Sequence, residues 1–236
     1  MPAPAYVAPA RNSYDVIIVG GAVIGSSIAY WLSEQQQSRQ SILVVERDSS
    51  YEFSSTALST SAIRQQYSNP INVKISQFGV ELIRSFAERM APFFPGEPAP
   101  DLGFKEYGYL YCTSPEGVDA ARARVEMQRG LGAHTVWLDP GALKSQFPWL
   151  NVDDLGGGSW GSQAEGWFDS MGLLMGFRRA ARARGVEYID NAVTGISVVC
   201  RSAETSKSAP GACSAKFVAD STMPVMPISA AVVSLT

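Results

Sequence analysis

The stretch that decides the fold is Asp15-Val-Ile-Ile-Val-Gly20-Gly-Ala-Val-Ile-Gly25, which leads from an apolar run into a glycine-rich turn. Its four β-branched residues predict a strand buried on both faces, as in a parallel sheet. Residues 21–33 carry apolar side chains at helical spacing, so we expect a helix after the turn. Ser41-Ile-Leu-Val-Val-Glu46 predicts a second buried strand. Together these segments make a βαβ unit.

The turn fits the pattern G-x-G-x-x-G, with Gly20, Ala22 and Gly25 in the three glycine positions. The first position permits the tight turn, and the third permits the helix to pack closely on the sheet. The middle position lets the main chain approach a pyrophosphate at the helix N-terminus. Ala22 departs from the pattern, because its methyl group can push the phosphate away. Glycine-rich turns also occur as plain connections, so the glycines alone leave both interpretations open.

The acid that ends the second strand favours a dinucleotide. Glu46 stands where a carboxylate accepts hydrogen bonds from the adenosine ribose, although a terminal glutamate on its own is more often a solvated strand end. Strand, turn, helix and acid in register predict dinucleotide binding. The acid also favours FAD or NAD over NADP, whose 2′-phosphate it would repel. The expected cofactor contacts at this place are Gly20, Gly21, Ala22, Val23, Ile24, Gly25, Glu46 and the adjacent Arg47.

Length and composition indicate a globular protein. The chain has 236 residues, of which 46% are hydrophobic and 17% are charged. The formal net charge is −3 and there is no basic stripe, so nothing favours nucleic-acid binding. Three widely spaced cysteines and a single histidine make neither a disulfide framework nor a metal site. No apolar run is long enough to predict a transmembrane helix.

Several segments resemble the D-amino-acid-oxidase-like flavoprotein family, in order and with similar spacing over roughly residues 15–198. The resemblance implies an α/β fold with a Rossmann-type FAD-binding domain, a parallel sheet and an inserted α+β substrate domain. It also selects FAD among the dinucleotides. The segments that carry it are residues 15–32, Val44-Val-Glu-Arg-Asp48, Ser55-Thr-Ala-Leu-Ser59, Ile63-Arg-Gln-Gln-Tyr67, Glu106-Tyr-Gly-Tyr-Leu110, Gln146-Phe-Pro-Trp149 and Glu165-Gly-Trp-Phe-Asp169.

Further patterns agree with this division of the chain. Helical spacing over 72–90 is followed by four prolines within 92–100, which end the helix. The expected later elements are a strand over 107–112, helices over 117–129, 139–147 and 170–184, and strands over 186–189 and 193–199. The expected parts are a flexible tail (1–13), a FAD-binding Rossmann part (14–100), a substrate-domain part (101–165), a return to the FAD-binding domain (166–199) and a divergent, poorly ordered tail (200–236).

The resemblance implies further site residues in the loop over 54–64. Hydroxyl groups there can donate to phosphate or flavin oxygens, but a polar surface loop is an equally good interpretation of any single one. Arg64 is a candidate for holding a substrate carboxylate or the flavin edge, and ordinary ion pairing is the alternative. Family glycines are replaced by Ser61 and Ala62, which can crowd the flavin. The residues implied in the site are Ser55, Thr56, Ser59, Ile63, Arg64 and Val193, the last through its backbone at the adenine or as a core valine.

Tyr107, Tyr109 and Tyr111 alternate along one expected strand and should share a face. They either line a pocket over the flavin or simply cover the sheet.

Three functions remain open at this point. The resemblance implies oxidation of a C–N bond in a small amine or amino acid by hydride transfer to FAD, with no catalytic side-chain base required. It also suggests a non-catalytic role in assembling mitochondrial respiratory complex I, and therefore a mitochondrial location. An NAD-dependent dehydrogenase is a third possibility, unsupported by anything after Glu46. Family members continue past this length and complete the flavin site there, so we expect this chain to be incomplete and to bind FAD weakly.

Overall fold

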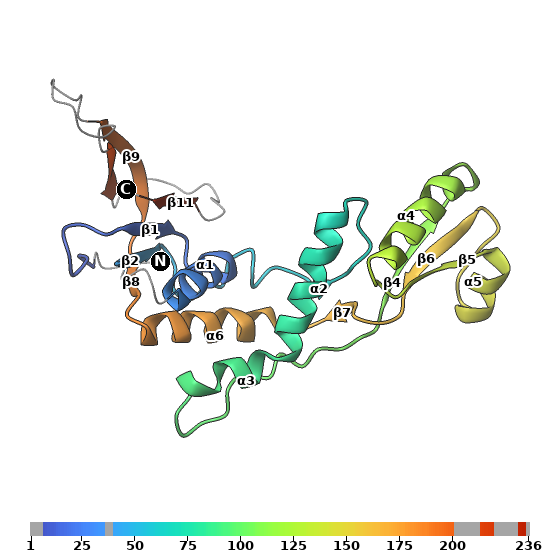
Figure 1. Cartoon of the computed structure of the whole chain (residues 1–236), viewed down its shortest axis with the longest axis horizontal. Coiled ribbons are helices and arrows are strands. Elements are labelled where there is room, and N and C mark those ends of the chain that lie inside the picture. The colour runs from blue at the N-terminus through green and yellow to red at the C-terminus, as the bar shows by residue number, and fades with distance from the viewer. Residues whose placement is uncertain (1–6, 36–39, 201–212, 220–230, 235–236) are drawn as a thin grey trace. The chain divides into compact units, whose positions relative to one another are not determined.

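The computed structural model describes residues 7–35, 40–200, 213–219 and 231–234. Residues 1–6 of the tail expected at 1–13, and most of the tail expected at 200–236, lie outside these residues. The chain forms two compact units, each described by itself below (Figure 1). The first unit comprises Met1–Leu58, Met90–Ala99 and Ser170–Thr236, and the second comprises Ser59–Arg89 and Pro100–Asp169. Residues 59–89, which the sequence grouped with the Rossmann part, belong to the second unit.

A four-stranded sheet with three parallel strands forms the centre of the first unit. Strands β1 (Val16–Val19), β2 (Ile42–Glu46) and β8 (Glu187–Asp190) run parallel, and β11 (Ala231–Ser234) pairs antiparallel with β1. Helix α1 (Val23–Glu34) connects β1 to β2. The expected βαβ unit and parallel sheet are therefore confirmed. All five residues of β2 are buried, as its apolar sequence predicts.

Strand β2 is buried on both faces of the sheet. On one face lies a core cluster of Tyr14, Leu43, Val45 and Ile189, with Ile17 and Val193 packed against it. The side chain of Ile18, which points to the other face, approaches Gly25 of α1. Helix α6 (Ser170–Ala183) packs on α1, where the rings of Tyr30 and Phe177 lie 5.1 Å apart. Two strands, β9 (Val193–Cys200) and β10 (Cys213–Ala219), pair antiparallel beyond the sheet.

Two arginines in and after α6 hold neighbouring parts of the first unit together: Arg179 contacts the proline-rich segment, and Arg184 contacts α1. The guanidinium of Arg179 donates from Nε to the carbonyl oxygen of Phe93 at 2.7 Å, and its Nη1 lies 2.5 Å from a carboxylate oxygen of Glu97. Arg184 reaches Glu34 of α1 at 3.3 Å. The segment begins within the short helix η1 (Ala91–Phe93), which directly follows α3 (Phe86–Met90).

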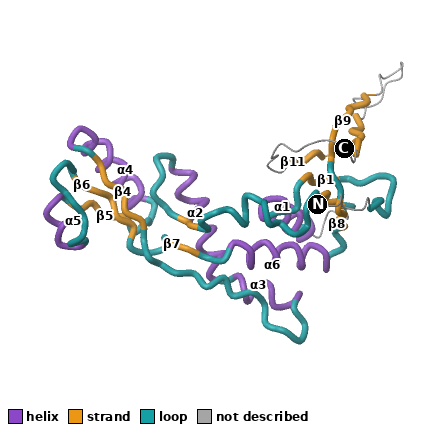
Figure 2. The backbone as a smooth tube through the Cα atoms, turned by 180° about the vertical axis from the view of Figure 1, so that it is seen from behind, coloured by secondary structure: helices purple, strands orange, loops and turns teal. Residues whose placement is uncertain are grey.

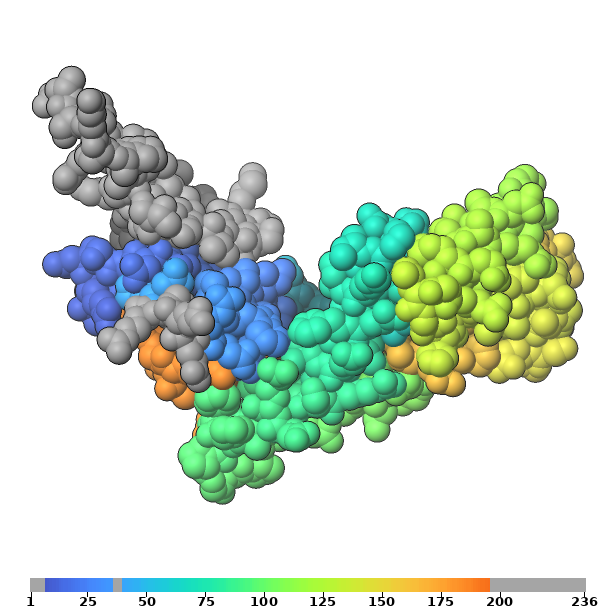
Figure 3. Space-filling model, viewed as in Figure 1, coloured from blue at the N-terminus to red at the C-terminus, as the bar shows by residue number. Residues whose placement is uncertain are grey.

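The second unit is α+β (Figure 2). Its antiparallel sheet has the order β4 (Tyr109–Thr113), β6 (Gly157–Gly161), β5 (Thr135–Leu138). Figure 3 shows α4 at the surface of this unit. The other elements are α2 (Pro70–Arg84), η2 (Pro115–Gly117), α4 (Val118–Gly130), α5 (Pro140–Gln146) and the paired strands β3 (Ala62–Ile63) and β7 (Gly166–Trp167).

Several elements differ from the expectation: one expected helix is divided, and the strands β3, β5, β6, β7, β10 and β11 were not expected. The helix expected over 72–90 is interrupted at Ser85, whose hydroxyl and N–H both donate to the carbonyl oxygen of Glu81 and close α2. Strand β6 was not expected, because its glycines resemble a loop. Glycine fits there because Trp137 and Glu165 occupy the space beside Gly157 and Gly161.

Within the described ranges, no helix is both long enough and apolar enough to cross a membrane. Those ranges also contain no group of three or more His, Cys, Asp or Glu side chains placed to share a metal ion.

Candidate functional site

The glycine-rich turn has the geometry that its outer two glycines predict. Gly20 has a φ of +94°, in the left-handed region that glycine adopts without strain, and its N–H donates to the carbonyl oxygen of Val45 at 2.8 Å. A Cβ atom at Gly25 would overlap the carbonyl oxygen of Gly20. The third position therefore needs glycine for α1 to begin so close to the turn.

Ala22 in the middle position fits the backbone without strain. Its φ of −67° and ψ of −167° are extended values that any residue adopts. Ala22 is the N-cap residue of α1, and a methyl group cannot accept a hydrogen bond from the first turn. The N-terminal amides of α1 are therefore not capped by this side chain, and the helix dipole makes that end attractive to an anion.

Glu46 lies directly against the turn. One carboxylate oxygen, Oε2, accepts from the N–H of Gly21 at 2.7 Å, and the other accepts from the N–H of Asp48 at 2.9 Å. Only 9% of the residue is exposed. Each oxygen still has a lone pair for a sugar hydroxyl, because an ionised carboxylate has about four acceptor positions. The turn and the acid, which the sequence placed in one site, are in contact.

The carboxyl end of β8 brings Val193 to the same sheet edge. The N–H of Asn191 donates to the carbonyl oxygen of Glu46 at 2.8 Å, and Val193 follows two residues later. Ligands of open parallel sheets bind outside the carboxyl ends of the strands. The Val193 side chain packs against the core cluster, which leaves its backbone as the part able to contact a ligand.

Thr56, in the loop after β2, brings a hydroxyl to the turn. Thr56 is 4% exposed, and its Oγ1 accepts from the N–H of Val23 at 3.2 Å, at the start of α1. The hydroxyl proton of Thr56 can then point to a bound phosphate. Ser55 and Arg47 are exposed, and Ile24 is 57% exposed on the first turn of α1.

A cluster of two tyrosines and an arginine beside the turn was missed by the sequence reasoning. Tyr51 is 1% exposed, has a φ of +58°, and places its hydroxyl 3.2 Å from where a Cβ atom of Gly21 would stand. The guanidinium carbon of Arg178 lies 5.6 Å from the ring centroids of both Tyr51 and Tyr188. Burial raises the pKa of Tyr51 to about 12. Tyr188 donates to the hydroxyl of Ser26, which donates to the carbonyl oxygen of Gly21.

Ser59, Ile63 and Arg64 belong to the second unit. The hydroxyl of Ser59 accepts from the N–H of Ser61, whose φ of +52° is a conformation that favours glycine. The backbone at 61 thus has the conformation of the glycine that the family resemblance implies at this position. Ile63 pairs with Gly166, and its Cδ1 lies 3.0 Å from the Cβ position of Gly79 in α2. Part of the Ile63 side chain is therefore used in packing.

Arg64 lies between aromatic rings. Its guanidinium carbon is 4.8 Å from the ring centroid of Tyr67 and 5.8 Å from that of Tyr111. Its Nε is buried and has no hydrogen-bond partner in the described part of the chain. Tyr109 and Tyr111 share a face, with ring centroids 6.1 Å apart, whereas Tyr107 precedes the strand and is 78% exposed. The expected common face therefore holds two of the three tyrosines.

Over residues 15–235, the chain matches the family described as FAD dependent oxidoreductase. The chain belongs to this family. The family resemblance and the α/β fold expected from the sequence are confirmed. The cofactor of FAD dependent oxidoreductases is FAD, which confirms the expected cofactor at the level of the family.

Similar proteins include the FAD-dependent oxidoreductase domain-containing protein 1 of Bos taurus, which is 42% identical over 191 residues. The match covers 80% of this chain but 38% of the bovine protein. The mitochondrial sarcosine dehydrogenase of Mus musculus is 28% identical over 192 residues, covering 80% of this chain and 20% of that protein. This FAD dependent oxidoreductase chain thus spans well under half the length of these relatives.

The solved structure of L-proline dehydrogenase from P. horikoshii has the same fold. It superposes with a TM-score of 0.60 at 24% identity, over 76% of this chain and 45% of the other. The Rossmann-type arrangement is therefore shared with a solved structure as well as with the sequence family of FAD dependent oxidoreductases.

Proposed function

We propose that this chain carries the FAD-binding turn and part of the substrate domain of an oxidoreductase that oxidises a C–N bond in a small amine or amino acid. The observation that carries the proposal is the contact between the Glu46 carboxylate and the N–H of Gly21 at the N-terminus of α1. The relatives named for sarcosine and L-proline support the substrate class, because both names denote secondary amino acids. The mitochondrial relative supports a mitochondrial location.

The residues of the first unit fit the adenosine and diphosphate parts of FAD. Glu46 would accept from the ribose hydroxyls, and the backbone of Val193 would contact the adenine. The amides of 20–25 would face the diphosphate, and Thr56 would donate its hydroxyl proton to a phosphate oxygen. Ser55 and Arg47, whose side chains are exposed, are proposed as further contacts of the cofactor.

The second unit would supply the contacts on the flavin and substrate side. Ser59, Ile63 and Arg64 are the proposed residues there. When bound there, FAD would supply the acceptor for a hydride from the substrate carbon. Arg64 would bind the carboxylate of an amino acid, since its guanidinium is held by two rings and offers donors in a planar fork. A neutral amine needs no proton acceptor from the chain before hydride leaves.

Titration of FAD into the purified chain, followed by flavin fluorescence, tests the proposal. We expect Glu46→Gln to weaken FAD binding by about tenfold or more, because a hydrogen bond to a charged group contributes about 1.5–3 kcal/mol. The matched control is Glu52→Gln, which removes the same charge from an exposed position in the following loop. Equal affinities of the two variants, or no saturable FAD binding by the unmodified chain, would contradict the proposal.

The alternative role in complex I assembly predicts a different result. Capture of complex I subunits by the chain, with no amine-dependent bleaching of bound flavin, would favour that role over catalysis. Bleaching by an amine or amino acid would favour the oxidoreductase.

A further inference from the structure

The segment over 64–67 is held at every residue by side chains from elsewhere in the second unit. It belongs to no helix or strand, so the regular ladder hydrogen bonds are absent within it. The carbonyl oxygen of Arg64 accepts from the hydroxyl of Ser76, and that of Tyr67 accepts from Nε2 of Gln128 at 2.9 Å. A loop that only connects two elements does not need this many hydrogen bonds from buried side chains. The segment has one charged side chain, Arg64.

The middle of this segment is held by Glu165. Oε1 of Glu165 accepts from the N–H of Gln65 at 2.7 Å, and Oε2 accepts from Nε2 of Gln66 at 2.9 Å. Glu165 is 1% exposed, so it cannot itself touch a ligand. The carboxylate fits beside β6 only because Gly161 has no side chain. A carboxylate buried this deeply must be compensated by donors and by positive charge.

Arg64 supplies the positive charge. Burial raises the pKa of Glu165, and the Arg64 charge and the hydrogen bonds from Gln65 and Gln66 oppose that rise. Burial raises the pKa of Tyr111, the Arg64 charge opposes that rise, and the Glu165 charge adds to it, so the three groups interact electrostatically. Arg64 therefore lies between two aromatic rings, and its charge is close enough to interact with that of the buried acid.

Gln66 connects Glu165 to the sheet. Its Nε2 also donates to the carbonyl oxygen of Tyr109 at 2.8 Å, and its Oε1 accepts from the hydroxyl of Ser159 at 2.7 Å. Tyr109 is in β4 and Ser159 is in β6, so the side-chain amide of Gln66 holds the segment over 64–67 against both strands.

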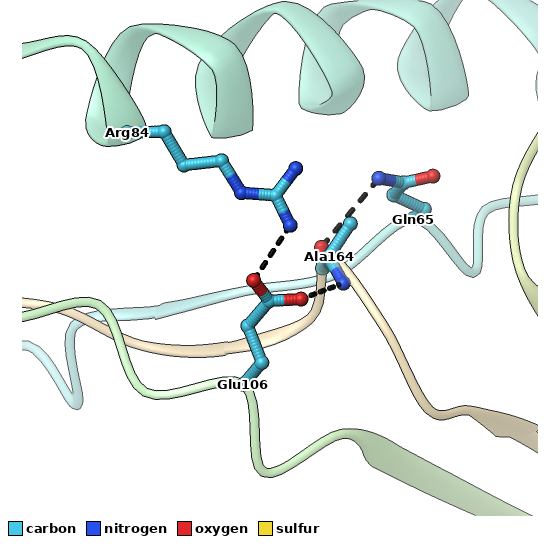
Figure 4. A network of polar contacts seen from close by, with 4 residues as sticks. All are labelled: Gln65, Arg84, Glu106 and Ala164. Atoms are coloured by element: carbon cyan, nitrogen blue, oxygen red, sulfur yellow. Dashed lines mark hydrogen bonds and ion pairs between the residues drawn. The ribbon is translucent and has the colours of Figure 1, made fainter.

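The turn that presents Glu165 is itself fixed, as Figure 4 shows. Ala164 has a φ of +57°, and its N–H donates to Oε2 of Glu106 at 2.7 Å. Oε1 of Glu106 pairs with Arg84 at 2.6 Å, and Nε2 of Gln65 reaches the carbonyl oxygen of Ala164 at 3.5 Å. Strained backbone that is held by several partners is a frequent feature of functional sites.

We propose that Glu165 is a positioning residue, which fixes residues 64–67 and thereby aims the Arg64 guanidinium at the carboxylate of the substrate. The inference rests on the proposed function of Arg64. Glu165 acts through the N–H of Gln65, the amide of Gln66 and the charge of Arg64. We therefore expect that removing the charge of Glu165 changes the position of the Arg64 side chain while the second unit stays folded.

The test uses the full chain labelled with ¹⁵N and benzoate as a carboxylate probe. The Nε–H resonance of Arg64 is assigned by its loss in Arg64→Gln. We expect Glu165→Gln to shift this resonance and to weaken benzoate binding at least about tenfold, the size of one lost charge-assisted contact. Glu126→Gln on the exposed face of α4 is the control for the charge change, and it should alter neither readout.

The two proposals fail in different ways. Benzoate binding that survives Arg64→Gln contradicts the carboxylate role of Arg64. Binding that is lost in Arg64→Gln but retained in Glu165→Gln, with an unshifted Arg64 resonance, overturns the positioning role alone. If Glu165→Gln does not fold, Gln66→Met removes the amide link while leaving the carboxylate. An unshifted Arg64 resonance in that variant overturns the inference, and a shifted one supports it.

Discussion

At the scale of single residues, Glu165 shows how a site can reduce the stability of the fold. Burial raises its pKa in the folded state above the value in the unfolded chain, so the folded state binds the proton more tightly. The stability contributed by Glu165 is therefore fully present below the unfolded pKa and is lost as the pH rises through the folded pKa. A carboxylate kept at such a position fits a functional requirement better than a stabilising one.

Urea unfolding across this pH range provides the measurement. We expect the free energy of unfolding of the unmodified chain, relative to Glu165→Gln, to fall as the pH rises from about 4 to about 7, because glutamine does not titrate. Glu126→Gln, at an exposed position, should give a difference that hardly changes with pH. A constant difference for Glu165→Gln, or one that rises with pH, contradicts the raised pKa of this group.

At the scale of elements, helix α1 begins in close contact with the turn before it. A Cβ atom at Gly25 would overlap the carbonyl oxygen of Gly20. We expect Gly25→Ala to lower the free energy of unfolding by about 2–3 kcal/mol, since overpacking outweighs the gain in helix propensity of about 1 kcal/mol. The same substitution at Gly130 of α4, where nothing lies within 4 Å, should be neutral or stabilising in the same urea titration. Similar effects of the two substitutions would show that α1 does not pack as described.

The elements also show which parts of the fold could be predicted from sequence. The strand, turn, helix and strand over 15–46 follow local rules of period and turn chemistry, so their order and their contact at Glu46 could be predicted. Strand β6 could not, because its glycines make room for side chains from distant segments. The contacts of Tyr51, Arg178 and Glu165 could not be predicted for the same reason, since their partners are far away in the sequence. Isolated aromatic or acidic residues give no periodic signal.

At the scale of the whole molecule, the proposed contacts of FAD are distributed over both compact units. The turn over 20–25, Glu46 and Thr56 are in the first unit, whereas Ser59, Ile63 and Arg64 are in the second. ADP and FAD share the adenosine diphosphate part, and only FAD has the flavin. Comparing the two ligands therefore separates the contacts predicted for each part of the cofactor. Ligand binding to the folded state slows the local opening that amide exchange reports.

Hydrogen exchange of the full chain should give a distinct pattern with each ligand. We expect ADP to protect amides over 20–26 and 42–48 and to leave residues 59–64 and the strands β4, β5 and β6 unchanged. FAD should protect the same first-unit amides and additionally those over 59–64, because the flavin side of the cofactor would contact them. Equal patterns with ADP and FAD would remove Ser59, Ile63 and Arg64 from the cofactor site. Protection by neither ligand over 20–26 would contradict the dinucleotide turn itself.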